Sequence, residues 1–117
     1  MTQNFGKQGE QLIVNYLQDQ NFTIITQNYK QFFGEIDIIA RKNNIIAFVE
    51  VKSRRNTKVS IFELVSFTKQ QKIIKTAKQY IAHNFSNNDG LTFRFDVALV
   101  ECKDQQNPEI IYIPNAF

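Results

Sequence analysis

The chain has 117 residues, of which 43% are hydrophobic, and this is enough for one domain with a single modest core. One cysteine excludes an intrachain disulfide and a cysteine-rich zinc site, and one histidine gives no support to a histidine-based zinc site. The N-terminal residues lack the apolar region of a signal peptide, and no apolar run approaches the roughly 18–20 residues that span a bilayer, so we expect a soluble, cytoplasmic protein without membrane contacts.

The net charge of +3 is mild, but the positive charge is unevenly distributed. Residues 52–78 contain eight lysines or arginines and only one acidic residue, Glu63. A locally basic surface is the electrostatic feature that a polyanion such as DNA requires, because it neutralises the phosphates. The charge distribution therefore favours DNA as a partner.

Apolar residues recur at helical spacing over residues 4–19, which predicts an amphipathic helix despite Gly6 and Gly9 near its start. These glycines would permit close approach of another element. Glu10 projects to the border of the apolar stripe, where its carboxylate either reaches a site on a sheet or faces solvent. Residues 22–29 are rich in strand-forming residues and predict the first strand.

Residues 34–52 predict a β-hairpin with its turn at Asn43–Asn44. Both arms are β-branched and apolar, and asparagine tolerates the positive φ angles that a tight primed turn requires at its central positions. Gly34 begins the first arm, where we expect it to allow the backbone to bend. Counting outward from the turn places Asp37 opposite Glu50.

Side-chain alternation divides this hairpin into an apolar face and a face that carries chemistry. Two directly opposed carboxylates, with Cβ atoms roughly 4.5–5.5 Å apart, repel each other unless a cation or a proton lies between them. We expect a hard divalent cation there, with a lysine close enough to polarise a water or a phosphate oxygen; the alternative is a set of charges that simply face solvent. The predicted apolar face contains Ile36, Ile38, Ala40, Ala47, Val49 and Val51, and the other face contains Glu35 opposite Lys52, Asp37 opposite Glu50, and Ile39 opposite Phe48.

Residues 53–60 are polar and basic, lack periodicity and predict a loop that leaves the site. Arg54 and Arg55 are candidates for contacts with phosphates. Arg54 lies nearer to the predicted site, whereas an ordinary solvated arginine is an equally good interpretation of Arg55.

A long helix is predicted over residues 61–85, with an apolar stripe on one side and lysines on the other. Lys69 projects to the border of the stripe, where it either contacts a phosphate near the site or extends along apolar surface to reach solvent. Lys72 is a further candidate for nucleic-acid binding, and a solvated helix face is the alternative interpretation of it and of the other lysines.

Two strands are predicted after the turn signal Asn-Asn-Asp-Gly at residues 87–90. Residues 91–101 alternate as a core strand does, and residues 109–114 form the last strand. Arg94 and Asp96 share one face, and we expect a structural ion pair between them rather than a catalytic role. The order α-β-β-β-α-β-β gives a single α/β domain with a mixed sheet flanked by two helices.

Seven short motifs carry a family resemblance: Gly9-Glu10, Gly34-Glu35-Ile36-Asp37, Phe48-Val49-Glu50-Val51-Lys52-Ser53-Arg54, Lys69-Gln70, Tyr80, Arg94-Phe95-Asp96-Val97 and Asn115-Ala116-Phe117. Together they resemble the bacterial UPF0102 (YraN-like) family over nearly the whole chain. That family is similar to the PD-(D/E)xK nuclease superfamily, which includes archaeal Holliday junction resolvases and restriction endonucleases. The resemblance implies one restriction-endonuclease-like domain over residues 1–117. The proline of the superfamily motif is absent, since Ile36 precedes Asp37.

The resemblance further implies that Glu10, Asp37, Glu50 and Lys52 are the active-site positions. We predict metal-assisted hydrolysis of phosphodiester bonds in DNA, structured or branched DNA included, with one or two Mg²⁺ or Mn²⁺ ions. The predicted metal ligands are the carboxylates of Asp37, Glu50 and Glu10 and the backbone carbonyl of Val51. Lys52 is expected to orient the water or to stabilise charge.

The competing interpretation is a non-catalytic nucleic-acid-binding or protein-interaction module that retains the nuclease fold. A chain of 117 residues supplies few elements for enclosing DNA. We therefore expect that a homodimer or a partner protein would be needed to complete a substrate channel.

Overall fold

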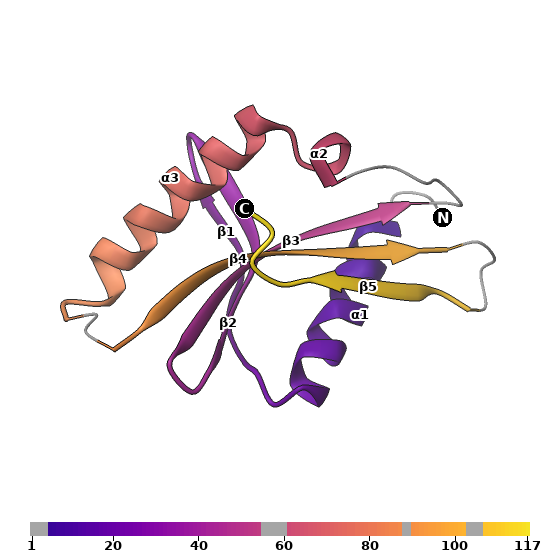
Figure 1. The fold of residues 1–117 in the computed structure, drawn as a ribbon, viewed down its shortest axis with the longest axis horizontal. Coiled ribbons are helices and arrows are strands. Elements are labelled where there is room, and N and C mark those ends of the chain that lie inside the picture. The colour runs from indigo at the N-terminus through magenta and orange to yellow at the C-terminus, as the bar shows by residue number, and fades with distance from the viewer. Residues whose placement is uncertain (1–4, 55–60, 88–89, 103–106) are drawn as a thin grey trace.

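A five-stranded mixed sheet with the order β1-β2-β3-β4-β5 organises the protein, as Figure 1 shows. The computed structural model describes residues 5–54, 61–87, 90–102 and 107–117. Neighbouring strands are antiparallel except for the parallel pair β3 and β4, which requires a long crossover connection. The strands are β1 (Thr23–Gln31), β2 (Gly34–Lys42), β3 (Ile45–Arg54), β4 (Thr92–Glu101) and β5 (Glu109–Ile113).

Three helical segments accompany the sheet: α1 (Phe5–Asp19), α2 (Ile61–Leu64) and α3 (Phe67–Asn84). The predicted order of elements is confirmed, but the prediction of one continuous helix over residues 61–85 is wrong. Ser66 has an extended backbone (φ −64°, ψ 161°), and its side chain accepts a hydrogen bond from the Lys69 N–H at 3.2 Å. Ser66 is therefore the N-cap that separates α2 from α3. Of the described helices, none is both long and apolar enough to cross a membrane.

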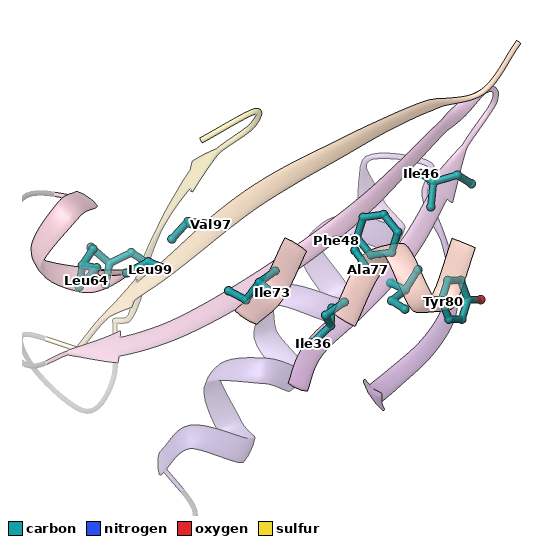
Figure 2. Close-up of a cluster of buried hydrophobic side chains, with 11 residues drawn as sticks. Ile36, Ile46, Phe48, Leu64, Ile73, Ala77, Tyr80, Val97 and Leu99 are labelled. Atoms are coloured by element: carbon teal, nitrogen blue, oxygen red, sulfur yellow. The ribbon is translucent and has the colours of Figure 1, made fainter. Parts of the chain in front are cut away.

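The two faces of the sheet are covered by different helices, α1 on one and α2 with α3 on the other (Figure 1). Strand β3 is buried on both faces, which explains its nearly continuous apolar run before the charged residues begin. The α1 side contains Ile13, Val14, Leu17, Ile38, Ala40, Ala47, Val49, Ala98 and Val100. The α3 side, drawn in Figure 2, contains Ile36, Ile39, Ile46, Phe48, Leu64, Val65, Ile73, Ala77, Tyr80, Val97 and Leu99.

The predicted hairpin register is confirmed from Lys42 opposite Ile45 to Ile38 opposite Val49. Of the two turn residues only Asn43 has a positive φ, 54°, which is the pattern of a II′ rather than a I′ turn. The β2–β3 ladder ends at Ile38, so Asp37 and Glu50 follow the predicted register without being a ladder pair.

Beyond the end of this ladder the pairing and the side-chain alternation both change. Glu35 pairs with Lys30 of β1, and the predicted pairing of Glu35 with Lys52 does not form in the sheet. Ile36 packs on the α3 side, whereas the prediction placed it on the same face as Ile38. The neighbouring strand is distorted at this level too, because Asn28 of β1 has a φ of 54°. The alternation is therefore broken around Asp37.

Two glycines allow close approaches that position the strand ends. A Cβ atom on Gly34 would lie 2.5 Å from Thr76 Oγ1 and 3.1 Å from the Lys72 carbonyl oxygen, so the start of β2 packs directly on α3. Gly34 thus serves close helix–strand packing rather than the predicted bend. A Cβ atom on Gly9 would lie 2.1 Å from Ser53 Oγ, which confirms a close approach of α1 to the end of β3.

Candidate functional site

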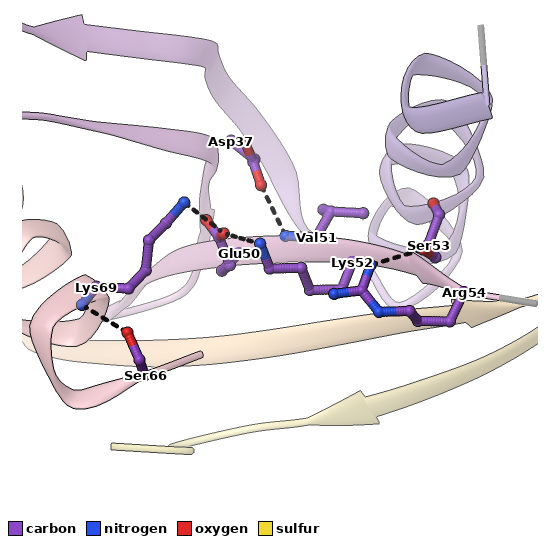
Figure 3. Close-up of polar contacts among 8 residues, drawn as sticks. All are labelled: Asp37, Glu50, Val51, Lys52, Ser53, Arg54, Ser66 and Lys69. Carbon is purple, nitrogen blue, oxygen red and sulfur yellow. Dashed lines mark hydrogen bonds and ion pairs between the residues drawn. The ribbon is translucent and has the colours of Figure 1, made fainter. Parts of the chain in front are cut away.

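The candidate site lies where β2 and β3 separate, and Figure 3 shows its strand and α3 residues. Asp37 comes from β2, Glu50 and Lys52 from β3, and Lys69 from the first turn of α3. The Val51 N–H donates a hydrogen bond to Asp37 Oδ2 at 2.8 Å. Beyond the last ladder pair, the hydrogen bond between β2 and β3 is thus made by the Asp37 side chain instead of its backbone. This hydrogen bond holds the Asp37 carboxyl beside the β3 backbone.

Glu50 is a buried carboxylate with two ammonium partners. Its residue is 4% exposed, and its Oε2 atom lies 3.2 Å from Lys52 Nζ and 3.3 Å from Lys69 Nζ. A buried charge is tolerated only when it is paired, and here the partners come from two separate elements, β3 and α3. The predicted proximity of Lys52 to Glu50 is confirmed, and Lys69 lies closer to the site than the helix projection indicated.

Asp37 experiences an environment that disfavours its charge. Burial, followed by the negative charge of Glu50, raises the pKa of Asp37 to about 7, and the hydrogen bond from the Val51 N–H only partly opposes this rise. A side-chain hydrogen bond with Glu50 also raises the pKa, so the two carboxyl groups are within reach of one shared proton. The predicted electrostatic conflict between these two acids is present, and it contributes to the raised pKa of Asp37.

Glu10 of α1 belongs to the same electrostatic group. Burial, followed by the charge of Glu35 and then that of Glu50, raises the pKa of Glu10, while a hydrogen bond with the Asn28 side chain lowers it. Glu10 also contributes to the raised pKa of Asp37. The structure therefore places Glu10 toward the sheet site, which favours the first of the two interpretations of its border position.

Sequence reasoning missed the contribution of Asn28 and Glu35 to this group. Asparagine is disfavoured in strands, so its presence inside an otherwise strand-like segment was an available signal of a local distortion. A left-handed backbone at a residue other than glycine is often retained where it positions a functional group. Here the distorted residue supports Glu10.

The donors available to a metal are two close carboxylates rather than a complete cluster. Among the described residues, no group of three or more histidine, cysteine, aspartate and glutamate side chains is arranged to hold a metal. The charge of Glu50 and a side-chain hydrogen bond with it both raise the pKa of Asp37, so the two carboxyls are neighbours, and the Val51 N–H is hydrogen-bonded to Asp37. Further oxygen donors to an ion there would be a backbone carbonyl, a water or the Glu10 carboxylate.

The predicted nucleic-acid-binding residues have different surroundings. Lys69 pairs with Glu50 and Lys72 is exposed on α3. Arg54 is half-buried and donates from Nη1 to the Ser53 carbonyl oxygen at 3.1 Å, whereas Arg55 lies outside the described residues. Three of the four predicted DNA-binding residues are therefore described, and they lie on the elements that form the site: Arg54 on β3, and Lys69 and Lys72 on α3.

The predicted ion pair between Arg94 and Asp96 is confirmed on β4, where Asp96 pairs with Val49 of β3. Arg94 Nε and Nη2 each donate to an Asp96 carboxylate oxygen at 2.9 Å. Asp96 is completely buried and also accepts hydrogen bonds from the Tyr112 hydroxyl and the Asn115 N–H.

Comparisons with known proteins agree with this sequence pattern. The family model described as "Uncharacterised protein family UPF0102" matches residues 9–100, a range that includes every described residue of the candidate site. A UPF0102 protein of Alkaliphilus metalliredigens is 43% identical over the whole of both chains. A UPF0102 protein of Vibrio cholerae is 38% identical and covers 95% of this chain and 89% of its own length. The chain therefore belongs to the uncharacterised protein family UPF0102.

Proposed function

We propose that this protein is a metal-dependent endonuclease that hydrolyses phosphodiester bonds in DNA, in the cytoplasm. The observation that carries the proposal is the Asp37–Glu50 pair: the Val51 N–H, next to Glu50, donates to Asp37 at 2.8 Å, and Lys52 Nζ lies 3.2 Å from Glu50. A buried acid beside a half-buried acid that repels it is costly to the fold, and such pairs are found where their charge has a chemical use.

The donor set suits a hard divalent cation such as Mg²⁺ or Mn²⁺. The candidate ligands are the carboxylates of Asp37 and Glu50, the Val51 carbonyl oxygen and the carboxylate of Glu10, all of them oxygen donors. A cation between the two acids would compensate the negative charges that repel each other there. When bound, the ion would supply a bound water of lowered pKa and neutralise charge on the phosphate.

The protein's own groups would then have distinct tasks. Lys52 Nζ, which now contacts Glu50, is placed to donate to the attacking water or to a phosphate oxygen. The Val51 N–H keeps Asp37 in its orientation. Lys69, Lys72, Arg54 and Arg55 would contact the DNA backbone on either side of the scissile phosphate.

A binding module without catalysis is the second candidate, and one observation favours it. Glu50 already has two ammonium partners, so much of its negative charge is compensated in the absence of any ion. In that case the lysines would serve the stability of the fold, and the same surface would bind DNA or a protein. A second copy of the chain or a partner protein would complete the channel under either proposal.

A cleavage assay separates the two candidates. The purified protein is incubated with labelled single-stranded, duplex, flapped and four-way-junction DNA in the presence of Mg²⁺, Mn²⁺ or EDTA. We expect cleavage of at least one substrate that requires the ion and is lost in Asp37→Asn, Glu50→Gln and Lys52→Met. Glu109→Gln is the matched control, since Glu109 is an exposed acid at the start of β5.

The outcomes have clear meanings. Cleavage that persists in Asp37→Asn would indicate a contaminant or another site. A folded wild-type protein that binds these DNAs and cleaves none of them, with either ion, would contradict the nuclease proposal and favour the binding module.

A further inference from the structure

An exposed aromatic residue stands at the tip of the connection between β1 and β2. Phe32 is 97% exposed, and the two-residue turn that contains it joins Gln31 directly to Gly34. Tight turns select asparagine, aspartate and glycine for their backbone angles and have no requirement for a bulky ring. The exposed ring of Phe32 is thus not explained by the turn itself.

The ring lies at the wall of a hollow of about 430 Å³ that extends toward the candidate site. A hollow of this size can accept a ligand of the dimensions of a nucleoside. Its lining includes Glu35 and Lys69, and Lys69 Nζ is 3.3 Å from Glu50 Oε2. Lys69 therefore connects the hollow at the hairpin tip with Glu50 of the acid pair.

The aromatic wall is supported from behind. Phe33 packs edge-on against Phe32 with ring centroids 5.0 Å apart. Lys75 of α3 lies over the Phe33 ring, 4.7 Å from its centroid, which ties the hairpin tip to the helix. Phe33 is thus held by its contact with Lys75 and supports Phe32, whose exposed ring is left free for a ligand.

The charge of the hollow is positive. Three lysines line it, Lys30, Lys69 and Lys72, together with the single acid Glu35. Lys30 lies 4.0 Å from Glu35. Lys69 pairs with Glu50, which already has Lys52 as a second ammonium partner, so positive charge remains in excess around the lining. A free aromatic face next to ammonium groups fits a ligand that has both a flat ring and a phosphate, and a nucleotide unit of a DNA strand has both.

We propose that Phe32 stacks on an unpaired base of DNA while Lys69 and Lys72 contact the adjoining phosphates, so that the preferred DNA has a single-stranded segment next to the phosphate at the acid pair. This inference deepens the proposed function and rests on it for the identity of the reacting phosphate. A base inside a duplex has both faces covered by its neighbours, so only an unstacked base offers a face to the ring.

The test measures binding in EDTA, where no cleavage occurs. The proteins are wild type, Phe32→Leu, Phe32→Trp and the control Ile111→Ala, which changes an exposed apolar residue on β5 at the opposite edge of the sheet. The DNAs are a duplex with a short single-stranded overhang, the same duplex with abasic overhang positions, and a closed duplex without free ends. Anisotropy of a labelled strand gives each affinity.

Phe32→Leu should weaken binding to the overhang DNA about tenfold, because it removes the aromatic face on which the base stacks. The same variant should bind the abasic and closed DNAs as wild type does. Phe32→Trp should retain the preference for the overhang, and Ile111→Ala should leave all three affinities unchanged.

The inference is overturned if Phe32→Leu matches wild type on the overhang, if it weakens all three DNAs equally, or if the wild type binds none of them. The last two results would point to a general structural role or to a protein contact at the hairpin tip. Cleavage with Mg²⁺ is scored separately. A base-dependent effect of Phe32 without any cleavage would contradict the nuclease proposal alone, whereas cleavage without that effect would contradict this inference alone.

Discussion

Two groups of acidic residues in the sheet, Asp96 on β4 and the pair of Asp37 and Glu50, differ in how their charge is compensated. Asp96 on β4 is completely buried and accepts hydrogen bonds from the Arg94 guanidinium, the Tyr112 hydroxyl and the Asn115 N–H. Each of its oxygens has partners within the fold. The hydrogen bond with Asp96 raises the pKa of Arg94, and burial, followed by the charge of Asp96, raises the pKa of Tyr112.

In the pair of Asp37 and Glu50 the compensation is one-sided, because the ammonium groups of Lys52 and Lys69 contact Glu50. Asp37 accepts one backbone hydrogen bond, and burial together with the neighbouring carboxylate raises its pKa to about 7. A fully paired acid contributes to stability, whereas the repulsion that raises the pKa of Asp37 is unfavourable for its charged form and can be relieved by a bound cation. The difference assigns a structural role to Asp96 and makes Asp37 and Glu50 the candidates for chemistry.

The largest expected effect is on cleavage by Asp37→Asn. We expect a loss of at least about 1,000-fold in rate, equivalent to about 4 kcal/mol, because the variant removes a metal ligand. Asparagine can still accept the Val51 N–H and removes the repulsion with Glu50, so the free energy of unfolding should stay level or rise. Cleavage kinetics and urea unfolding measure the two quantities, and a variant that is less stable and still active would reverse the assigned roles.

Asp96→Ala should show the opposite behaviour. It leaves the Arg94 guanidinium and the Tyr112 hydroxyl without their common acceptor, and breaking a buried ion pair in this way costs about 3 kcal/mol. Urea unfolding should report that loss, while cleavage per folded molecule, measured at low temperature, stays within a few-fold of wild type. A stable variant that has lost cleavage would place Asp96 in the active site.

The stability of the protein without divalent ions should fall as the pH rises from about 5 to 8. Asp37 has a pKa of about 7 in the folded protein against an ordinary value of 3.8, so the folded state retains a proton that the unfolded chain has released. This contribution to stability is present at low pH and is lost through the folded pKa, with a slope of at most about 1.4 kcal/mol per pH unit. Unfolding in EDTA across this range should give a flatter profile for Asp37→Asn, and identical profiles would contradict the assigned proton.

A smaller effect is expected from Lys69→Gln on DNA binding. Removing one phosphate contact should weaken binding without regard to sequence and reduce the slope of log affinity against log salt by about 1. Lys78→Gln is the matched control, because Lys78 is an exposed lysine on α3 that does not line the hollow. Equal slopes for the two variants would remove Lys69 from the DNA contact.

The register of β2 and β3 could be predicted because a two-residue turn and an alternating pattern determine it locally. The same reasoning placed Lys52 beside Glu50, and helical spacing placed Glu10 at the border of its apolar stripe. These features depend only on residues close in sequence, and the structure contains all of them.

The end of the β2–β3 ladder could not be predicted in this way. It depends on the approach of α3 to Gly34 and on the left-handed backbone of Asn28, which are contacts between elements distant in sequence. The contact of Lys69 with Glu50 has the same origin, since it requires the α3 start that Ser66 defines. Local sequence patterns thus identified Asp37 and Glu50 as site residues, whereas tertiary packing determines the distance between their carboxyl groups.

Paramagnetic broadening by Mn²⁺ tests the central claim most directly. In spectra of the backbone amides, sub-stoichiometric to millimolar Mn²⁺ should broaden signals around Asp37 and Glu50 in a saturable manner, and Asp37→Asn should abolish this response. Asp96 pairs with Val49, next to Glu50, so amides around Asp96 also lie near the ion, and their broadening should disappear in Asp37→Asn together with that at Asp37 and Glu50. Absence of saturable broadening near Asp37 and Glu50, or an unchanged response in Asp37→Asn, would contradict a metal site at the acid pair.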